Sequence, residues 1–273
     1  MRGLLGSLLV LPALLVIVLL YLYPFGLAVW ISFSGEDGFT LEHYQRVYEV
    51  YWEDVIFTFW TSFLSAVIAA VLGILIAAYL RLGADDPIKS FINQLYRIPI
   101  FLPMVVVAQM MRGFLAPHGT LNMALFNLGL SQPIEFFDWK GLVIGFVWKQ
   151  APFMALIILS GFLMVKDEHI EAARVAGASD LRVLTEILLP MTRNTVAIAF
   201  ALAYASNVAT FTLPYMLIGG AKPTAITVDI AHRVTFFGDW ATANALGVVS
   251  FLLVSVFAVF YLREMVRRGV YER

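Results

Sequence analysis

The chain has 273 residues, of which 61% are hydrophobic and only 14% are charged. Soluble proteins carry about 25% charged residues, and a chain of this size cannot bury so much apolar surface in water. The composition therefore excludes a soluble domain and indicates a membrane protein. The net charge of −1 excludes a strongly basic nucleic-acid-binding protein, and the absence of cysteine excludes disulfides, thiolate metal sites and a cysteine nucleophile.

Charge-free runs that could cross a bilayer, which takes about 20 apolar residues, follow one another along the chain. The first extends from Gly3 to Gly35, and we expect this helix to be retained and to break or end near Pro24. The second is Val55–Leu80. The third, Ile98–Met111, is short and lies between two arginines, so it must borrow residues from either side. The remaining runs are Gly141–Val165, interrupted by Lys149, then Asn194–Ala221 and Trp240–Leu262.

These runs predict an all-α integral membrane protein with six transmembrane helices, because backbone polar groups in lipid must be satisfied within the spanning segment. The sequence contains no internal repeat, and its loops are too short for a soluble domain. We expect three parts. Residues 1–54 form an N-terminal transmembrane helix with an external loop, residues 55–262 form a five-helix core with a cytoplasmic loop at 166–190, and residues 263–273 form a basic cytoplasmic tail.

The basic residues predict the orientation of the helices. One side of a six-helix arrangement holds twelve lysines and arginines, the other side holds five, and Lys149 lies inside a span. Because basic residues accumulate in cytoplasmic loops, both termini are expected in the cytoplasm.

The external segment between Glu36 and Asp54 is acidic and aromatic. Aromatic side chains suit the membrane interface, so a helix lying on the outer surface is the simpler interpretation. A loop that docks a partner is the alternative.

The cytoplasmic loop at 166–190 has the pattern of two short amphipathic helices. Asp167 can cap the first helix and Ser179 the second, while Gly177 can take the positive φ of the turn between them. Pro190 is expected to mark a boundary before the fifth span. These helices either dock into another protein or cover the cytoplasmic end of the bundle.

The same loop resembles the EAA loop of permease subunits from binding-protein-dependent ABC importers. Glu171, Ala172 and Ala173 are followed by Gly177 and then by Ile187-Leu188-Leu189-Pro190 at the spacing of that motif. Phe39–Tyr44 is similar to a segment of many permeases. Leu213–Gly220, followed by Gly238–Trp240 and Ala243–Leu246, is similar to permeases of the spermidine/putrescine, iron and aminophosphonate group. Trp148-Lys149 and Pro152-Phe153 are similar to sugar and glycerol-phosphate permeases.

The resemblance implies the type I ABC importer permease (MetI-like) fold and a multi-pass protein of the bacterial or archaeal cytoplasmic (inner) membrane. It implies that the loop contacts an ATP-binding subunit through Glu171, Ala172, Ala173, Gly177, Ser179 and Pro190. The chain has no G-x-x-x-x-G-K-[ST] phosphate loop, so it is expected to be non-catalytic and to bind no cofactor. ATP and Mg²⁺ would bind to the ATP-binding subunit dimer. The other implied partners are a second permease subunit, identical or homologous, and an external solute-binding protein.

Polar residues inside spans are costly and are therefore candidates for a translocation pathway. Lys149 extends to the outer interface, lines the route or pairs with the second permease subunit. The hydroxyl groups either line the route or join helices by hydrogen bonds. The candidates are Gln109, Lys149, Gln150, Tyr204, Asn207, Thr210 and Tyr215. No catalytic residue is predicted, and the four histidines show no metal-ligand spacing.

The substrate prediction is a polyamine-type or related small charged solute, with a sugar or glycerol phosphate as the alternative. An unpaired Lys149 in the route would repel a polyamine. Two other classes of protein compete. A secondary transporter would show repeats or carboxylates within its spans, and an intramembrane enzyme would need His, Asp or Glu there; the predicted spans have none of these.

Overall fold

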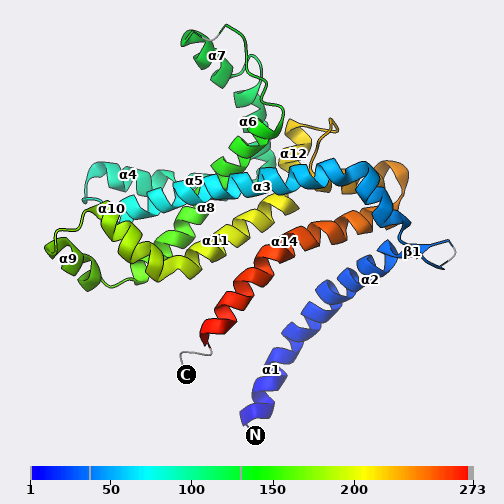
Figure 1. Ribbon diagram of the computed structural model, residues 1–273, viewed down its shortest axis with the longest axis horizontal. Helices are drawn as coiled ribbons and strands as arrows, with labels where there is room; N and C mark the ends of the chain where they lie inside the picture. The colour runs from blue at the N-terminus through cyan, green and yellow to red at the C-terminus, as the bar shows by residue number, and fades with distance from the viewer. Residues whose placement is uncertain (1, 37, 130, 270–273) are drawn as a thin grey trace.

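The computed structural model describes residues 2–36, 38–129 and 131–269, which form helices and one two-stranded hairpin (Figure 1). In chain order the elements are α1 (Arg2–Ile17), the π-helical turn η1 (Val18–Leu22), α2 (Tyr23–Ser32), β1 (Ser34–Gly35), β2 (Gly38–Phe39), α3 (Glu42–Leu82), α4 (Pro87–Leu95), α5 (Ile98–Phe101), α6 (Met104–Leu115), α7 (Thr120–Asn127), α8 (Trp139–Met164), α9 (Asp167–Val175), α10 (Asp180–Val183), η2 (Leu184–Leu188), α11 (Leu189–Ala209), α12 (Thr212–Leu217), α13 (Ile226–His232), η3 (Arg233–Phe237) and α14 (Trp240–Gly269).

Within the described ranges, five helices are long and apolar enough to cross a membrane, and a bent pair of helices makes a sixth span. The expected all-α fold with six spans is confirmed. The five are Val10–Ser32, Glu42–Leu82, Trp139–Met164, Asp180–Ala209 and Trp240–Phe257.

The first span does not end at Pro24, contrary to the sequence prediction. Helix continues to Ser32, and η1 comes directly before α2. A proline lacks the N–H that would bond the carbonyl four residues earlier, and for Pro24 that residue is Leu20, inside η1. The wider π-helical turn accommodates the proline without ending the helix.

The external segment forms no separate surface helix. Residues 42–54 are the first turns of α3, which continues without a break to Leu82. Val47, Tyr51 and Val55 recur every four residues and pack on α13 and α14, so this face is part of the bundle. The expected domain boundary at 54/55 therefore lies inside α3.

The third span is broken rather than straight. The segments Pro87–Phe101 and Met104–Asn127 are bent by 107° relative to each other. The break falls at Leu102, which is extended because a proline follows it. The sequence predicts correctly that this span needs flanking residues, but not the sharp bend.

The fifth span breaks at Thr210 and Phe211, one turn before Pro214, the residue expected to break it. Pro214 itself is buried inside α12. It cannot donate to the carbonyl of Thr210, and that oxygen instead accepts a hydrogen bond from Thr227 Oγ1 at 3.0 Å. The helix is therefore interrupted at Thr210, whose carbonyl Pro214 cannot bond, and not at the proline itself.

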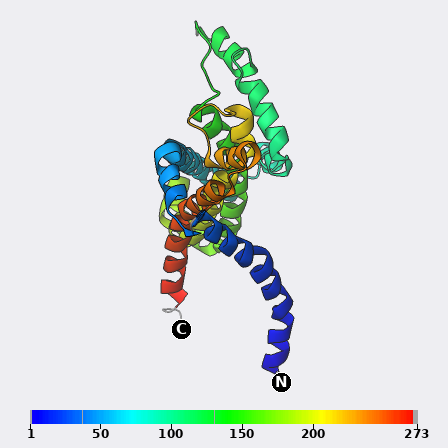
Figure 2. The same ribbon diagram turned by 90° about the vertical axis from the view of Figure 1, so that its right-hand side faces the viewer.

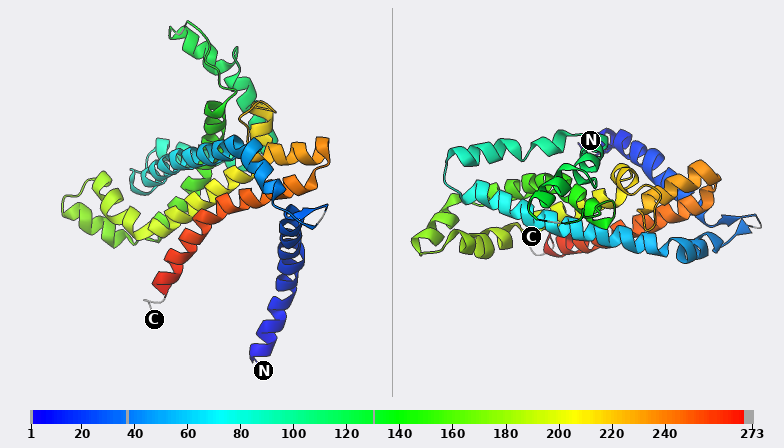
Figure 3. Two further views of the ribbon diagram at one scale, coloured as in Figure 1. Left: turned by 45° about the vertical axis from the view of Figure 1, so that its right-hand side comes forward. Right: turned by 90° about the horizontal axis from the view of Figure 1, so that it is seen from above.

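The centre of the molecule is a bundle of α3, α8, α11 and α14, in which α3 packs along α8 and α11. Figures 2 and 3 show that α1 and α7 extend away from this bundle in different directions, whereas α6 packs on α8 and α12. Of the residues Val10–Ser32, only Ser32 is buried. α2 packs mainly on α14, where the rings of Phe25 and Phe251 lie 4.5 Å apart. α14 continues past the expected core boundary at 262 to Gly269, and residues 270–273 of the expected tail lie outside the described residues.

Candidate functional site

α9 is held against the end of the bundle by two arginines. Arg81, in the last turn of α3, donates to Asp167 Oδ1 at 2.5 Å and to the carbonyl of Val165 at 3.0 Å. Arg174 donates to the carbonyl of Leu82 and to Asp180 Oδ1, both at 2.9 Å. These contacts fix the position of α9 relative to the spans.

Asp167 does not cap α9, as the sequence predicts, because it is the first residue of the helix. Lys166 occupies the N-cap position and makes no capping hydrogen bond through its side chain. The carboxylate of Asp167 is instead engaged by Arg81. The predicted cap at Ser179 is present, since its side chain accepts a hydrogen bond from the backbone N–H of Arg182 at 3.4 Å.

α9 has an inner face and an outer face. Ile170 is buried and Ala173 is half-buried, and both pack on the core formed by the ends of α3 and α8. Glu171 and Ala172 are exposed, and near them Val175 and Leu181 expose 90% and 70% of their surface. The inner face therefore covers the bundle, whereas the outer face presents apolar side chains beside a carboxylate.

Gly177 makes the predicted turn, with a φ of +84° and its N–H donating to the carbonyl of Arg174 at 2.9 Å. The helix that follows is not a separate short one. α10, η2 and α11 form one 30-residue helix from Asp180 to Ala209. Pro190 is exposed and lies within this helix rather than at a boundary, and the carbonyl that it cannot bond, that of Glu186, lies in η2.

Two of the predicted pathway residues meet in the interior of the bundle. Gln150 on α8 donates from Nε2 to Asn207 Oδ1 on α11 at 3.0 Å. Asn207 Nδ2 in turn donates to the carbonyl of Ser62 on α3 at 3.3 Å. The two amides expose only 4% and 2% of their surface, so they join three spans in this state of the molecule.

Lys149 makes backbone contacts that the sequence does not predict. Its ammonium donates to the carbonyls of Pro99, Ile100 and Leu102 at 2.8, 3.1 and 2.7 Å. These carbonyls lie at the C-terminal end of α5, where the helix ends and its carbonyls lack intrahelical partners. Lys149 therefore stabilises the break in the third span.

Within the described residues, the other pathway candidates make no hydrogen bond to this pair. Tyr204 is fully buried, with its ring 4.5 Å from that of Phe257, and within the described residues its hydroxyl has no hydrogen-bond partner. Thr210 lies in the break of the fifth span and donates to the carbonyl of Ser206 at 2.6 Å. Tyr215 is exposed and stacks on Phe211 at 5.0 Å, and Gln109 is exposed on α6.

A polar cluster that the sequence does not predict lies where α3 meets the loop after α12. Asp54 is completely buried. It accepts hydrogen bonds from Lys222 Nζ at 2.9 Å and from the backbone N–H of Thr224 at 2.8 Å. The hydroxyl of Thr58 accepts from the N–H of Ile226 at 2.9 Å. Asp54 is 168 positions from Lys222, so no local spacing could have indicated the pair.

Asp229, on α13, belongs to the same cluster. It is buried, and its Oδ2 has no hydrogen-bond partner within the described residues. Burial, followed by the charge of Asp54, raises the pKa of Asp229 to about 7, although Lys222 and Arg233 act in the opposite direction. The Arg233 guanidinium also donates to the hydroxyl of Tyr51, which connects α3 to η3.

Comparisons with known proteins bear on this arrangement. The model of the family described as binding-protein-dependent transport system inner membrane component matches residues 69–270, which include α9 and both amides of the Gln150–Asn207 pair. The trehalose/maltose transport system permease protein of Thermococcus litoralis is 29% identical over 95% of this chain and 92% of its own length. The sulfoquinovosyl glycerol transport system permease protein of Agrobacterium fabrum is 28% identical over 95% and 90%. The spermidine/putrescine transport system permease protein of Haemophilus influenzae is 24% identical over 93% and 92%.

Solved structures share the fold. A chain of a bacterial alginate ABC transporter, in complex with an alginate pentasaccharide-bound periplasmic protein, superposes with a TM-score of 0.81 at 20% identity, over 98% of this chain and 95% of that chain. A chain of an inward-facing methionine ABC transporter superposes with a TM-score of 0.58 at 18% identity, over 84% and 98%. The expected type I permease fold is confirmed.

Proposed function

This chain belongs to the family of binding-protein-dependent transport system inner membrane components and is the permease subunit of an ABC importer, and we propose that its solute is a sugar or a similar uncharged polyhydroxylated molecule. As a permease it is non-catalytic, and the ATPase of the importer is a separate subunit. ATP and Mg²⁺ would bind to that partner, as the missing phosphate-loop motif implies.

The chemistry of the Gln150–Asn207 pair supports an uncharged solute. Two neutral amides can exchange their mutual hydrogen bond for bonds to hydroxyl groups, because each amide offers both donors and acceptors. A polyamine would need carboxylates to offset the cost of taking its charges out of water. In the described part of the chain, the two amides bond only to each other and to the carbonyl of Ser62, which are all uncharged. A phosphate at this pair would need a free cation beside it, and the ammonium of the neighbouring Lys149 is already bound to three carbonyls.

The names of the relatives support a sugar-type solute over a polyamine. The relatives of Thermococcus and Agrobacterium, named for trehalose/maltose and for a sulfoquinovosyl glycerol, are more similar to this chain than the polyamine permease of Haemophilus. The polyamine prediction is thus the less well supported one.

The exposed edge of α9 is the surface that we assign to the ATP-binding subunit. Glu171 and Ala172 share a face of α9 with Val175, and Leu181 on α10 is also exposed; both apolar side chains would otherwise stay in water. The remaining partners that we propose are a second permease subunit and an external solute-binding protein. In this arrangement α9 and both termini face the cytoplasm.

Uptake by the reconstituted importer tests the substrate assignment. The chain would be placed in proteoliposomes with its ATP-binding and second permease subunits and the cognate solute-binding protein. Uptake of labelled trehalose, maltose and spermidine would be measured with and without ATP. We expect ATP-dependent uptake of a sugar. Uptake of spermidine alone would overturn the sugar assignment, and uptake of the solute without ATP would overturn the coupling.

A further inference from the structure

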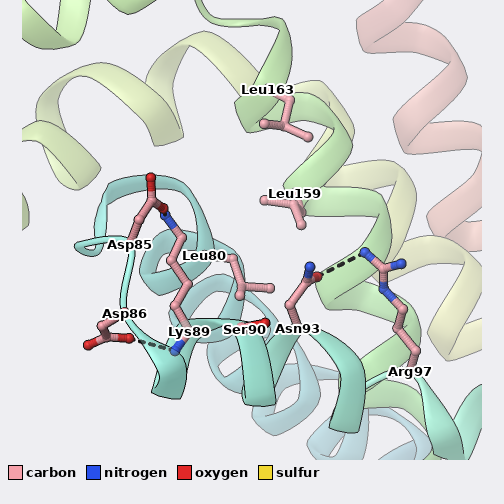
Figure 4. A pocket seen from close by; sticks show the side chains of 9 residues that line it. All are labelled: Leu80, Asp85, Asp86, Lys89, Ser90, Asn93, Arg97, Leu159 and Leu163. Carbon is pink, nitrogen blue, oxygen red and sulfur yellow. Dashed lines mark hydrogen bonds and ion pairs between the residues drawn. The ribbon is translucent and has the colours of Figure 1, made fainter.

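An open cavity of about 550 Å³ lies between α4 and the adjoining ends of α3 and α8 (Figure 4). It is at the end of the bundle that carries α9, because Leu80 lines it and the carbonyl of Leu82, two residues later, binds Arg174. Neither the coupling loop nor the Gln150–Asn207 pair contributes to it. Its lining residues are Leu80, Asp85, Asp86, Lys89, Ser90, Asn93, Arg97, Leu159 and Leu163.

α4, together with the two residues after it, has three different edges. Ile92 and Tyr96, four positions apart, pack on the core of the bundle. Residues three or four apart share one face of a helix, so the remaining positions form two further sets. Ile88, Phe91 and Leu95 are apolar and exposed. Ser90, Asn93 and Arg97 are polar and line the cavity.

The charges on the cavity side are unequally compensated. Lys89 Nζ donates to Asp85 Oδ1 at 2.8 Å and to the carbonyl of Gly83 at 2.9 Å, so its charge is paired. Asp86 accepts the backbone N–H of Lys89 at 2.7 Å and caps α4. The Arg97 guanidinium donates to Asn93 Oδ1 at 2.9 Å and to the hydroxyl of Tyr96 at 3.3 Å, so its partners in the described part of the chain are neutral.

We propose that this cavity is the cytoplasmic exit vestibule of the transport route, and that Ser90, Asn93 and Arg97 bind the hydroxyl groups of the solute as it leaves. The proposal rests on the proposed function for the kind of solute, but not for the position of the vestibule. A guanidinium, a carboxamide and a hydroxyl on one face provide several donors and acceptors, which suits a polyhydroxylated molecule.

The two exposed edges of α4, one apolar and one polar, indicate that the polar edge faces water. In a membrane, polar side chains face the interior of the protein or a water-filled cavity and mark solute pathways. The apolar edge at Ile88, Phe91 and Leu95 provides the surface for lipid. α4 therefore separates lipid on one edge from water on the other, and the hydrated edge lies between the bundle and the cytoplasm.

Cysteine labelling tests the vestibule directly, since the chain contains no cysteine. Single variants S90C and N93C on the polar edge would be compared with I88C and F91C on the apolar edge. The importer would be placed in inside-out vesicles, and a charged, membrane-impermeant thiol reagent would be added on the cytoplasmic side with and without trehalose. We expect the polar-edge cysteines to react at least about tenfold faster, because reaction requires an accessible thiolate, and trehalose to slow only these two.

Each other outcome overturns a stated part of the proposal. Equal labelling of the two edges, or labelling of neither, would overturn the hydrated vestibule. Fast polar-edge labelling that trehalose and maltose leave unchanged would overturn solute binding there. A wrong sugar assignment is detected by a separate measurement of ATP hydrolysis in the same vesicles. If the solute is not a sugar, the solute-binding protein with trehalose or maltose would not stimulate that hydrolysis.

Arg97→Gln provides a second, independent measurement, with Lys89→Gln as its matched control. Asp85 already neutralises Lys89, whereas the Arg97 guanidinium is available to the solute. We expect Arg97→Gln to lower the maximal uptake rate by about tenfold, which corresponds to roughly 1.4 kcal/mol, and Lys89→Gln to change it less than twofold. Equal effects of the two variants would count against a solute contact at Arg97.

Discussion

The carboxamide of Gln150 on α8 donates to Asn207 Oδ1 on α11 at 3.0 Å, and both residues are buried. A second bond from Asn207 to the carbonyl of Ser62 connects the pair to α3. Within the described part of the chain, these two polar residues are thus bonded to each other and to a neighbouring backbone carbonyl. Such a contact holds the three spans together.

Substitution of one member should therefore destabilise more than substitution of both. Asn207→Leu leaves the amide of Gln150 buried without its partner, which costs roughly 1–3 kcal/mol. The double variant Gln150→Leu/Asn207→Leu removes both polar groups and should recover much of that stability. Thermal unfolding of the purified protein in detergent measures this, and sugar uptake should be lost in the single and double variants alike. Normal uptake by the double variant would limit the pair to a structural role.

Lys149 should matter for the stability of the third span rather than for charge selection. Lys149→Met would leave the carbonyls of Pro99, Ile100 and Leu102 without their donor. A buried polar group without its partner costs roughly 1–3 kcal/mol, so we expect a lower Tm and faster proteolysis near residues 99–103. Lys149→Arg retains a donor and should lose less. Unchanged stability of the methionine variant would favour the alternative in which Lys149 only extends to the interface.

The buried acid Asp229 predicts a pH dependence of stability. Its pKa is raised from 3.8 to about 7 by burial and then by the charge of Asp54. An acid with a raised pKa in the folded state binds its proton more tightly when folded. Its stabilising contribution is therefore fully present below about pH 4 and is lost as the pH rises through about 7. The Tm should fall by on the order of a few degrees between about pH 5 and about pH 8.

Asp229→Asn is the control for this effect, because an amide does not titrate. The variant should be more stable than the wild-type protein at about pH 8 and should show a flatter dependence of Tm on pH. Lys222, Arg233 and Tyr51 face the same cluster. An unchanged slope in Asp229→Asn would mean that another group titrates.

The spans could be predicted from the sequence because the bilayer imposes a local rule. Any segment that crosses lipid must be apolar over about 20 residues, and the uncharged runs coincide with α2, α3, α8, α11 and α14. The breaks were harder to place. Pro214 indicates that the fifth span is interrupted, but the interruption falls at the carbonyl of Thr210, which is stabilised by Thr227 from α13.

The site could be predicted only where its chemistry is local. Gly177 and Ser179 occupy the positions that their conformational preferences indicate. The partners of Lys149 lie 47 to 50 positions earlier in the chain, and the Asp54–Lys222 contact joins residues 168 positions apart. No spacing rule reports contacts of that length, because they depend on how the spans pack.

The exposed edge of α9 leads to a last prediction, on the coupling of this chain to its ATPase. An ideal Cβ added at Gly177 meets no atom within 4 Å, although its φ of +84° disfavours most side chains. Asp and Asn both tolerate this conformation better than other residues do, so Gly177→Asp and Gly177→Asn differ mainly in charge. We expect both variants to insert and fold, and the aspartate variant to lose more uptake because its charge would be buried against the partner.

Glu171 offers the complementary pair of variants. Glu171→Lys reverses an exposed charge and Glu171→Gln only removes it. The lysine variant should lower ATP-dependent uptake by at least about tenfold, and the glutamine variant by less, since a rim charge contributes less than a repulsive contact costs. Co-purification of the ATP-binding subunit should follow the same order. Each of the single variants Glu171→Lys and Gly177→Asp places an unfavourable charge on the same exposed edge, and such a charge is costly when a close protein contact buries it. Full uptake by both variants would therefore show that the ATP-binding subunit docks elsewhere.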